Sequence, residues 1–144
     1  MKSFKIADGD LVVSARRVEM VTNEDKLVQD LSLWLRKPIG SDFTAPNFGS
    51  TLLSLIGAAD AREQRFDAES EVLRVLALYQ ATQFEKVKSA IDNGTASVYS
   101  RRELLNEIRG VNSSVDQDTV TIVATIATAQ GRDISLPVIV SEGI

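Results

Sequence analysis

The chain has 144 residues, 44% of them hydrophobic and 25% charged, which is typical of one domain with a buried core. It contains neither cysteine nor histidine, so disulfides, thiolate or imidazole metal sites and histidine-dependent nucleophilic catalysis are excluded. A net charge of −4 argues against a general nucleic-acid binder, and no run approaches the roughly 18 apolar residues of a membrane span. We expect a single soluble domain over residues 1–144, with no cofactor, no metal, and no nucleic-acid or membrane partner.

The first third of the chain predicts short strands and then a helix. Apolar residues on both sides of Asp8–Asp10 predict strands joined by a tight turn, because these acids lack the ligand spacing of a calcium loop. A helix is expected to begin at Thr22 or Asn23 and to end before Pro38, with its leucines in one stripe. Trp34 lies in that stripe, and we expect it to anchor the core beneath the following loop.

A turn-rich loop follows this helix. Phe43 and Phe48 are too apolar for a merely solvated loop, so we expect them to brace it against the domain or a partner. Pro46 and Gly49 supply backbone angles that other residues reach only at a cost. A short helix is expected after the loop, over residues 52–56.

The longest expected element is a helix running roughly from Ala61 to Ile91. Its apolar residues recur at helical spacing and form one side, opposite a charged side. The apolar side holds Phe66, Leu73, Leu76, Phe84, Val87 and Ile91, widened by Val72 and Tyr79. Helices in small domains average nearer a dozen residues. We therefore expect part of this helix to pack on something beyond its own chain, or the other elements to lie along it.

The last third of the chain changes to strand periodicity. Residues 104–111 fit either a short helix or an irregular strand. From Thr119, apolar and polar residues alternate through a turn at residues 129–133 and on to Val140. Pro137 cannot donate a hydrogen bond to a neighbouring strand, which places this strand at a sheet edge or a bulge, and an open edge invites another chain. The predicted class is α+β, with a small antiparallel sheet beside two main helices and a C-terminal β-hairpin.

Several of these stretches together resemble the baseplate wedge family of contractile phage tails, also called lysozyme-like baseplate proteins or sheath initiators. In chain order they are Asp8–Asp10, Gln29–Leu31, Pro38–Asp42, Pro46–Leu53, the long helix, and an Arg-rich junction that leads into the hairpin. The order of elements matches over nearly the whole chain. The aromatic-Gly-Ser-Thr-Leu segment that begins at Phe48 is the most specific piece.

The resemblance implies a structural protein of the virion that has no enzymatic activity. It would be present in several copies in a ring of the tail baseplate and assembled in the host cytoplasm. Its implied partners are other wedge proteins, the tail tube and the tail sheath. In the family, the C-terminal strands are extended by strands of neighbouring sheath subunits, so the terminal hairpin would seed the sheath. We assign this contact to Ile134, Leu136, Val138 and Val140.

The chain departs from the family at the junction before the hairpin. The family carries a Glu-Pro-Arg triplet there, used for contacts with neighbouring wedge subunits, whereas this chain reads Tyr-Ser-Arg-Arg-Glu over residues 99–103. We carry over an interfacial arginine, Arg102 in preference to Arg101, with Glu103 beside it. A planar guanidinium suits that contact because it binds carboxylates through two hydrogen bonds. Two solvated arginines in a turn are the alternative.

Two other function classes remain open. A generic oligomerisation or adaptor module would explain the long helix and the open edge equally well, and it predicts a homodimer that buries the helix. The family's older label suggests glycoside hydrolysis, which needs two carboxylates, one of them in an apolar pocket. Glu19 is the one acid inside an apolar stretch, and no partner for it is evident. We therefore predict no catalytic residue.

Overall fold

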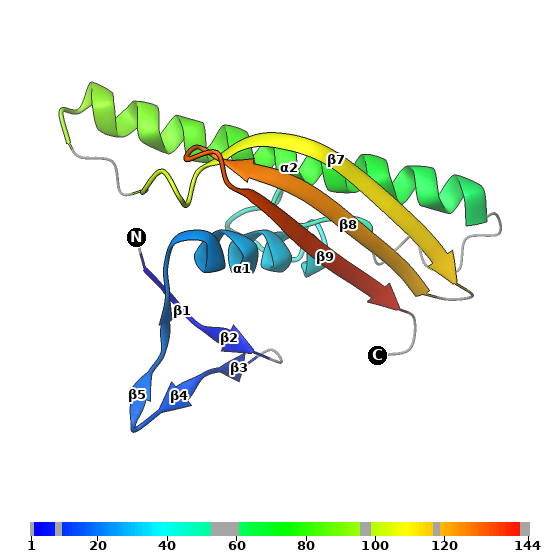
Figure 1. The fold of residues 1–144 in the computed structure, drawn as a ribbon, viewed down its shortest axis with the longest axis horizontal. Coiled ribbons are helices and arrows are strands. Elements are labelled where there is room, and N and C mark those ends of the chain that lie inside the picture. Colours follow the sequence, from blue (N-terminus) through cyan, green and yellow to red (C-terminus); the bar gives the residue numbers. More distant parts are fainter. Residues whose placement is uncertain (1, 8–9, 53–60, 96–98, 117–118, 142–144) are drawn as a thin grey trace.

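Two helices pack on a three-stranded antiparallel sheet, with a small β unit beside the first helix (Figure 1). The structure is a computed structural model that describes residues 2–7, 10–52, 61–95, 99–116 and 119–141. The main elements are α1 (Asn23–Arg36), α2 (Ala61–Asp92), β7 (Leu105–Asp116), β8 (Thr119–Thr128) and β9 (Asp133–Ser141). This arrangement confirms the predicted α+β class, both main helices and the C-terminal hairpin. The short helix expected over residues 52–56 lies almost entirely outside the described residues.

The sheet has the strand order β7-β8-β9, with β8 in the centre. β7 settles the open interpretation of residues 104–111 in favour of a strand. Its register against β8 shifts twice, between Leu105 and Glu107 and again between Ile108 and Gly110. Each shift inserts an extra residue and reverses the inside-outside alternation. A regular two-residue period therefore could not be recognised in this segment.

The core lies between the inner face of the sheet and the two helices. Leu27, Leu31 and Leu35 of α1 are all buried, which confirms the apolar stripe predicted for that helix. They meet the inward residues of the sheet, among them Ile122 and Leu136, which are wholly buried. Each such side chain contributes about 1.5–3 kcal/mol on burial, so this layer holds the sheet and helices together.

The apolar side predicted for α2 is only partly correct. Among the α2 side chains that the structure describes, residues 65–92, those buried against the rest of the protein are Ala68, Val72, Val75, Leu76, Tyr79 and Gln83. Phe66, Leu73, Phe84 and Ile91 are instead 70%, 44%, 66% and 69% exposed. At 100° per residue these four lie within about 20° of one another and more than 100° from the centre of the buried face. The helix therefore has two separate apolar faces, which the sequence pattern had merged.

The N-terminal β unit is a folded ribbon of six two-residue strands. They are β1 (Ser3–Phe4), β2 (Ile6–Ala7), β3 (Asp10–Leu11), β4 (Val13–Ser14), β5 (Arg17–Val18) and β6 (Met20–Val21). The strands pair as β1–β6, β2–β3 and β4–β5, which gives the triangular outline in Figure 1. At the centre the amide of Lys5 donates to the carbonyl of Glu19, the amide of Glu19 to Val12, and the amide of Val12 to Lys5, at 2.8–3.0 Å. These three hydrogen bonds join the three strand pairs to one another.

Within the described residues, neither helix is long and apolar enough to cross a membrane.

Candidate partner-binding surfaces

The edge of β9 is the first surface of interest. β9 pairs with β8 on one side, and no described strand pairs with its other side. In an antiparallel pair, residues alternate between those whose main-chain groups bond the neighbour and those whose groups point away. Thr128 and Arg132 are a hydrogen-bonded pair, because the amide of Thr128 donates to the carbonyl of Arg132 at 2.9 Å. Ile126 and Ile134 pair two residues farther along each strand, so the main-chain groups of Ile134 also face β8. The groups that face away from β8 are therefore those of Asp133, Ser135, Pro137 and Ile139.

Pro137 lies in this outward row, opposite Val123. Because its missing N–H would have faced away from β8, the pairing within the sheet loses no hydrogen bond. The position confirms the prediction that Pro137 marks a sheet edge. The outward row thus offers amide donors on both sides of a single gap at Pro137.

Two of the four side chains that the sequence assigned to the sheath contact, Ile134 and Leu136, point into the protein itself. Leu136 is wholly buried, and Ile134 packs against the same core cluster. Val138 and Val140 continue the pairing of β9 with β8, but their side chains lie outside the described residues. Ile134 and Leu136 therefore hold β9 in its own sheet. An added strand would meet the main chain of the alternate residues, and that contact stays a prediction.

The junction before the sheet contains a carboxylate with an internal role. Glu103 is 2% exposed. Its carboxylate accepts hydrogen bonds from the amide of Asn23 at 3.3 Å and from the amide of Ser100 at 3.2 Å. Asn23 is the first residue of α1, where amides lack partners inside the helix. Glu103 therefore caps α1 from a distant part of the chain, and in this structure it does not lie on a surface that a partner could reach.

The two arginines of this junction differ in their surroundings. Arg102 donates from Nε to Oε1 of Glu24 in α1 at 2.8 Å, and its side chain is 43% exposed. The hydrogen bond from Arg102 lowers the pKa of Glu24, and the Glu24 carboxylate raises the pKa of Arg102. Arg101 is exposed. Arg102 thus ties the junction to α1 with part of its guanidinium accessible, and a partner contact at either arginine stays a prediction.

The loop after α1 is fastened by one of its two aromatic residues. The rings of Phe48 and Trp34 meet edge to face with their centroids 4.7 Å apart, and Nζ of Lys37 lies 4.8 Å from the centroid of Phe48. This confirms Trp34 as an anchor beneath the loop. Phe43 is 100% exposed, so it does not brace the loop against the domain, and a contact of Phe43 with a partner stays a prediction. The difference arises because the loop turns between the two positions; Pro46, between them, is also exposed.

Gly49 closes this loop at a position that only glycine fits. Its φ is +113°, and a Cβ built there would lie 2.4 Å from the carbonyl oxygen of Lys37. The next residue, Ser50, donates its amide to the same carbonyl at 2.7 Å. The prediction that Gly49 supplies an unusual backbone angle is confirmed, since an L-residue would meet both strain and a clash.

A cavity of about 260 Å³ lies beneath the loop, with Trp34, Phe48, Tyr79 and Tyr99 among its lining residues. Its polar contacts are internal. Lys26 pairs with Asp30, and the hydroxyl of Tyr79 donates to the same carboxylate at 3.3 Å. Burial, with the neighbouring charge of Asp30, raises the pKa of Tyr79. The polar groups at this cavity thus stabilise the packing of α1 on α2.

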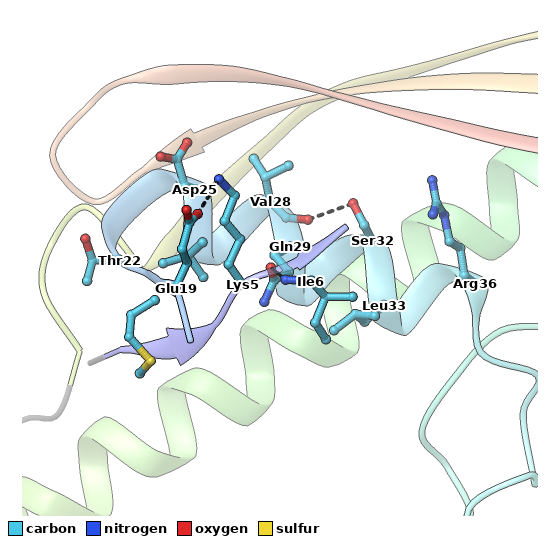
Figure 2. Close-up of a pocket in the computed structure, with 12 residues that line it drawn as sticks. Lys5, Ile6, Glu19, Thr22, Asp25, Val28, Gln29, Ser32, Leu33 and Arg36 are labelled. Carbon is cyan, nitrogen blue, oxygen red and sulfur yellow. Dashed lines mark hydrogen bonds and ion pairs between the residues drawn. The ribbon is translucent and has the colours of Figure 1, made fainter. Parts of the chain in front are cut away.

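A groove of about 790 Å³ runs between the N-terminal β unit and α1 (Figure 2). Gln29 of α1 bridges it by accepting from the amide of Ile6 at 2.9 Å and donating to the carbonyl of Phe4 at 2.8 Å. In the wall of the groove, Nζ of Lys5 pairs with Oε2 of Glu19 at 3.0 Å. Glu19 is 36% exposed and paired with a lysine, which is not the apolar enclosure that a general acid requires.

One side of the N-terminal β unit is apolar. Each of the three strand pairs has two apolar residues directly opposite each other, and residues opposite each other point to the same side of a two-stranded ribbon. The couples are Phe4 with Met20, Ile6 with Leu11, and Val13 with Val18. All of them except Ile6 are 40–61% exposed. In the part of the chain that the structure describes, no group of three or more acidic residues is placed to hold a metal ion.

Comparison with known proteins gives a fold relationship. No protein-family model and no curated protein matches the chain. The structure is similar to the crystal structure of a protein from Geobacter sulfurreducens that is provisionally described as a tail lysozyme. The TM-score is 0.60 at 14% sequence identity, and the match covers 94% of this chain and 98% of the other. The fold is therefore of the tail-lysozyme-like type over nearly its full length.

Proposed function

We propose that this protein is a structural component of a contractile phage tail baseplate, of the wedge or sheath-initiator type. It seeds the sheath by pairing the open edge of β9 with a strand of a neighbouring sheath subunit. The observation that carries the proposal is the outward row of β9, whose main-chain donors and acceptors have no strand partner in the described structure. The tail-lysozyme-like fold and the sequence resemblance to baseplate wedge proteins support the same function.

The proposal places the protein in the virion, in several copies around the tail axis. Other wedge subunits and the tail tube are its remaining partners. Arg101 and the accessible part of Arg102 lie at the junction where the family makes wedge contacts, which supports a wedge partner there. The protein acts by assembly and not by hydrolysis. The groove beside α1 is lined by two carboxylates, Glu19 and Asp25, but Glu19 is 36% exposed and paired with Lys5, so it lacks the apolar enclosure that a general acid requires.

Capture of the tail sheath protein by the purified chain tests the proposal. Ser135→Pro removes an outward amide and leaves the β8 pairing in place, whereas Ser135→Ala removes the same hydroxyl and keeps the amide. One main-chain hydrogen bond corresponds to about threefold to tenfold in affinity. We expect Ser135→Pro to lose that much and Ser135→Ala to bind as the wild type does. Pro137→Thr, which fills the gap in the row, should gain a similar factor.

Equal capture by the Ser135→Pro and Ser135→Ala variants, both shown to be folded by circular dichroism, would refute pairing through this edge.

A further inference from the structure

The exposed apolar face of α2 has the spacing of a helix-pairing seam. Its positions alternate in steps of four and three residues, the heptad spacing by which one helix packs along another. They are Phe66, Ser70, Leu73, Ala77, Gln80, Phe84, Val87 and Ile91, and six of the eight are apolar. We call these eight positions the α2 seam. It extends over 26 residues, from Phe66 to Ile91, or about 38 Å of helix.

The α2 seam is distinct from the face that α2 buries in the core. Its four largest residues, Phe66, Leu73, Phe84 and Ile91, are the ones found exposed, two of them by more than two thirds. Exposed apolar patches of this extent on soluble proteins mark contact sites. A hollow of about 180 Å³ lies beside Phe84, lined also by Gln80 and Val87 of the seam. The surface therefore has both the knobs and the recesses that helix pairing requires.

We propose that the α2 seam packs against the α2 seam of a second copy of this chain, with the two helices antiparallel about a twofold axis. Placing the axis at the middle of the seam, between Ala77 and Gln80, aligns large residues with large ones. Phe66 then lies opposite Ile91 of the second copy, and Leu73 lies opposite Phe84. Leu73 of one copy then lies at the hollow beside Phe84 of the other copy, and this hollow accommodates the Leu73 side chain.

The charges beside the seam select this orientation. Asp67 and Lys88 flank the two ends of the seam on its solvent side, away from the core, and both are exposed. In the antiparallel arrangement Asp67 of each copy faces Lys88 of the other, which gives two opposite-charge pairs. A parallel arrangement would set this flank of each helix against the opposite flank of the other, so Asp67 and Lys88 would not face each other and neither pair would form. A second copy is therefore the complementary occupant of this surface.

This contact goes beyond the proposed function, because the dimer forms in addition to the strand pairing at β9 and does not replace it, as it would in a generic oligomerisation module. α2 packs mainly along β7, at the opposite edge of the sheet from β9 (Figure 1). A copy bound at the α2 seam thus leaves the outward row of β9 free for a sheath strand. The two contacts are tested separately, because self-association is measured on the isolated chain without any sheath protein.

Charge exchange tests the arrangement by sedimentation equilibrium of the full chain. Asp67→Lys alone and Lys88→Glu alone each turn both pairs repulsive, and we expect each to weaken self-association by about tenfold. An equimolar mixture of the two variants should restore it, because the mixed dimer regains both opposite-charge pairs. Lys86→Glu reverses an exposed charge on the side of α2 that faces away from the seam, and this variant should associate as the wild type does.

Cysteine pairing gives an independent readout, since the chain has no cysteine of its own. A mixture of the Leu73→Cys and Phe84→Cys variants should form a disulfide-linked dimer of one chain of each kind under mild oxidation, and each variant alone should form far less. A wild-type chain that stays monomeric up to its highest soluble concentration would overturn the proposal. So would a mixture of the two charge variants that associates no better than either alone. Preferential cross-linking of each cysteine variant with itself would overturn the antiparallel orientation.

Discussion

Replacing Glu103 by alanine should destabilise the protein more than any change at the surface of the same junction. The carboxylate is 2% exposed and accepts from the amides of Asn23 and Ser100, at 3.3 and 3.2 Å. An amide left without a partner costs about 1–3 kcal/mol when buried. Both amides are partly buried and both bonds are long, so we take about 1 kcal/mol for each. With about 1 kcal/mol for the lost packing, the expected loss is about 3 kcal/mol.

Urea unfolding followed by the fluorescence of Trp34 and by circular dichroism measures this loss. Glu107→Ala is the matched control, because that carboxylate is 55% exposed and pairs with Arg109 at 3.5 Å on the surface. We expect the control to change the free energy of unfolding by no more than about 0.5 kcal/mol. Glu103→Gln, which keeps one acceptor oxygen, should fall between the two. A Glu103→Ala variant as stable as the control would refute the capping role of Glu103.

Three further changes concern the loop after α1. Gly49→Ala should cost at least about 2–4 kcal/mol in urea unfolding, because its Cβ would lie 2.4 Å from the carbonyl oxygen of Lys37 at a φ of +113°, and a smaller loss would contradict this loop geometry. Hydrogen bonds from the Thr44 hydroxyl and from Lys37 lower the pKa of Asp42 to about 2. Its contribution to stability should be present above the ordinary pKa of about 4 and lost as the pH falls through 2. Wild type should therefore be more stable than Asp42→Asn at pH 7, and the two should converge between about pH 4 and 2; a difference that does not vary with pH would count against these bonds. Phe43→Ser should leave the melting temperature unchanged, because Phe43 is fully exposed, and a marked drop would show that its ring is packed.

Local signals explain which elements could be predicted from the sequence. The bounds of α1 follow from polar residues at its start and from Pro38 after its end, and β8 and β9 follow from strict alternation. The edge position of Pro137 followed from its missing amide alone, because the cost of that missing donor depends only on which side of the strand it faces. Each of these inferences required only neighbouring residues.

The features that sequence reasoning missed depend on distant parts of the chain. Glu103 lies next to two arginines, which suggested a charged surface, but its acceptors serve the first turn of α1 about 80 residues away. The two apolar faces of α2 could not be separated by periodicity, since the buried face is selected by where β7 crosses the helix. Phe43 and Phe48 are equivalent in sequence terms, and only the position of Trp34 distinguishes them.

Amide hydrogen exchange along β9, measured by NMR with and without the tail sheath protein, tests the central claim most directly. In the free chain the outward amides of Ser135 and Ile139 should exchange fast, while the amide of Ile134, which faces β8, should be protected. If a sheath strand is added to this edge, the amides of Ser135 and Ile139 should become protected and that of Ile134 should change little. Sheath protein that binds while both outward amides continue to exchange fast would contradict the proposed function.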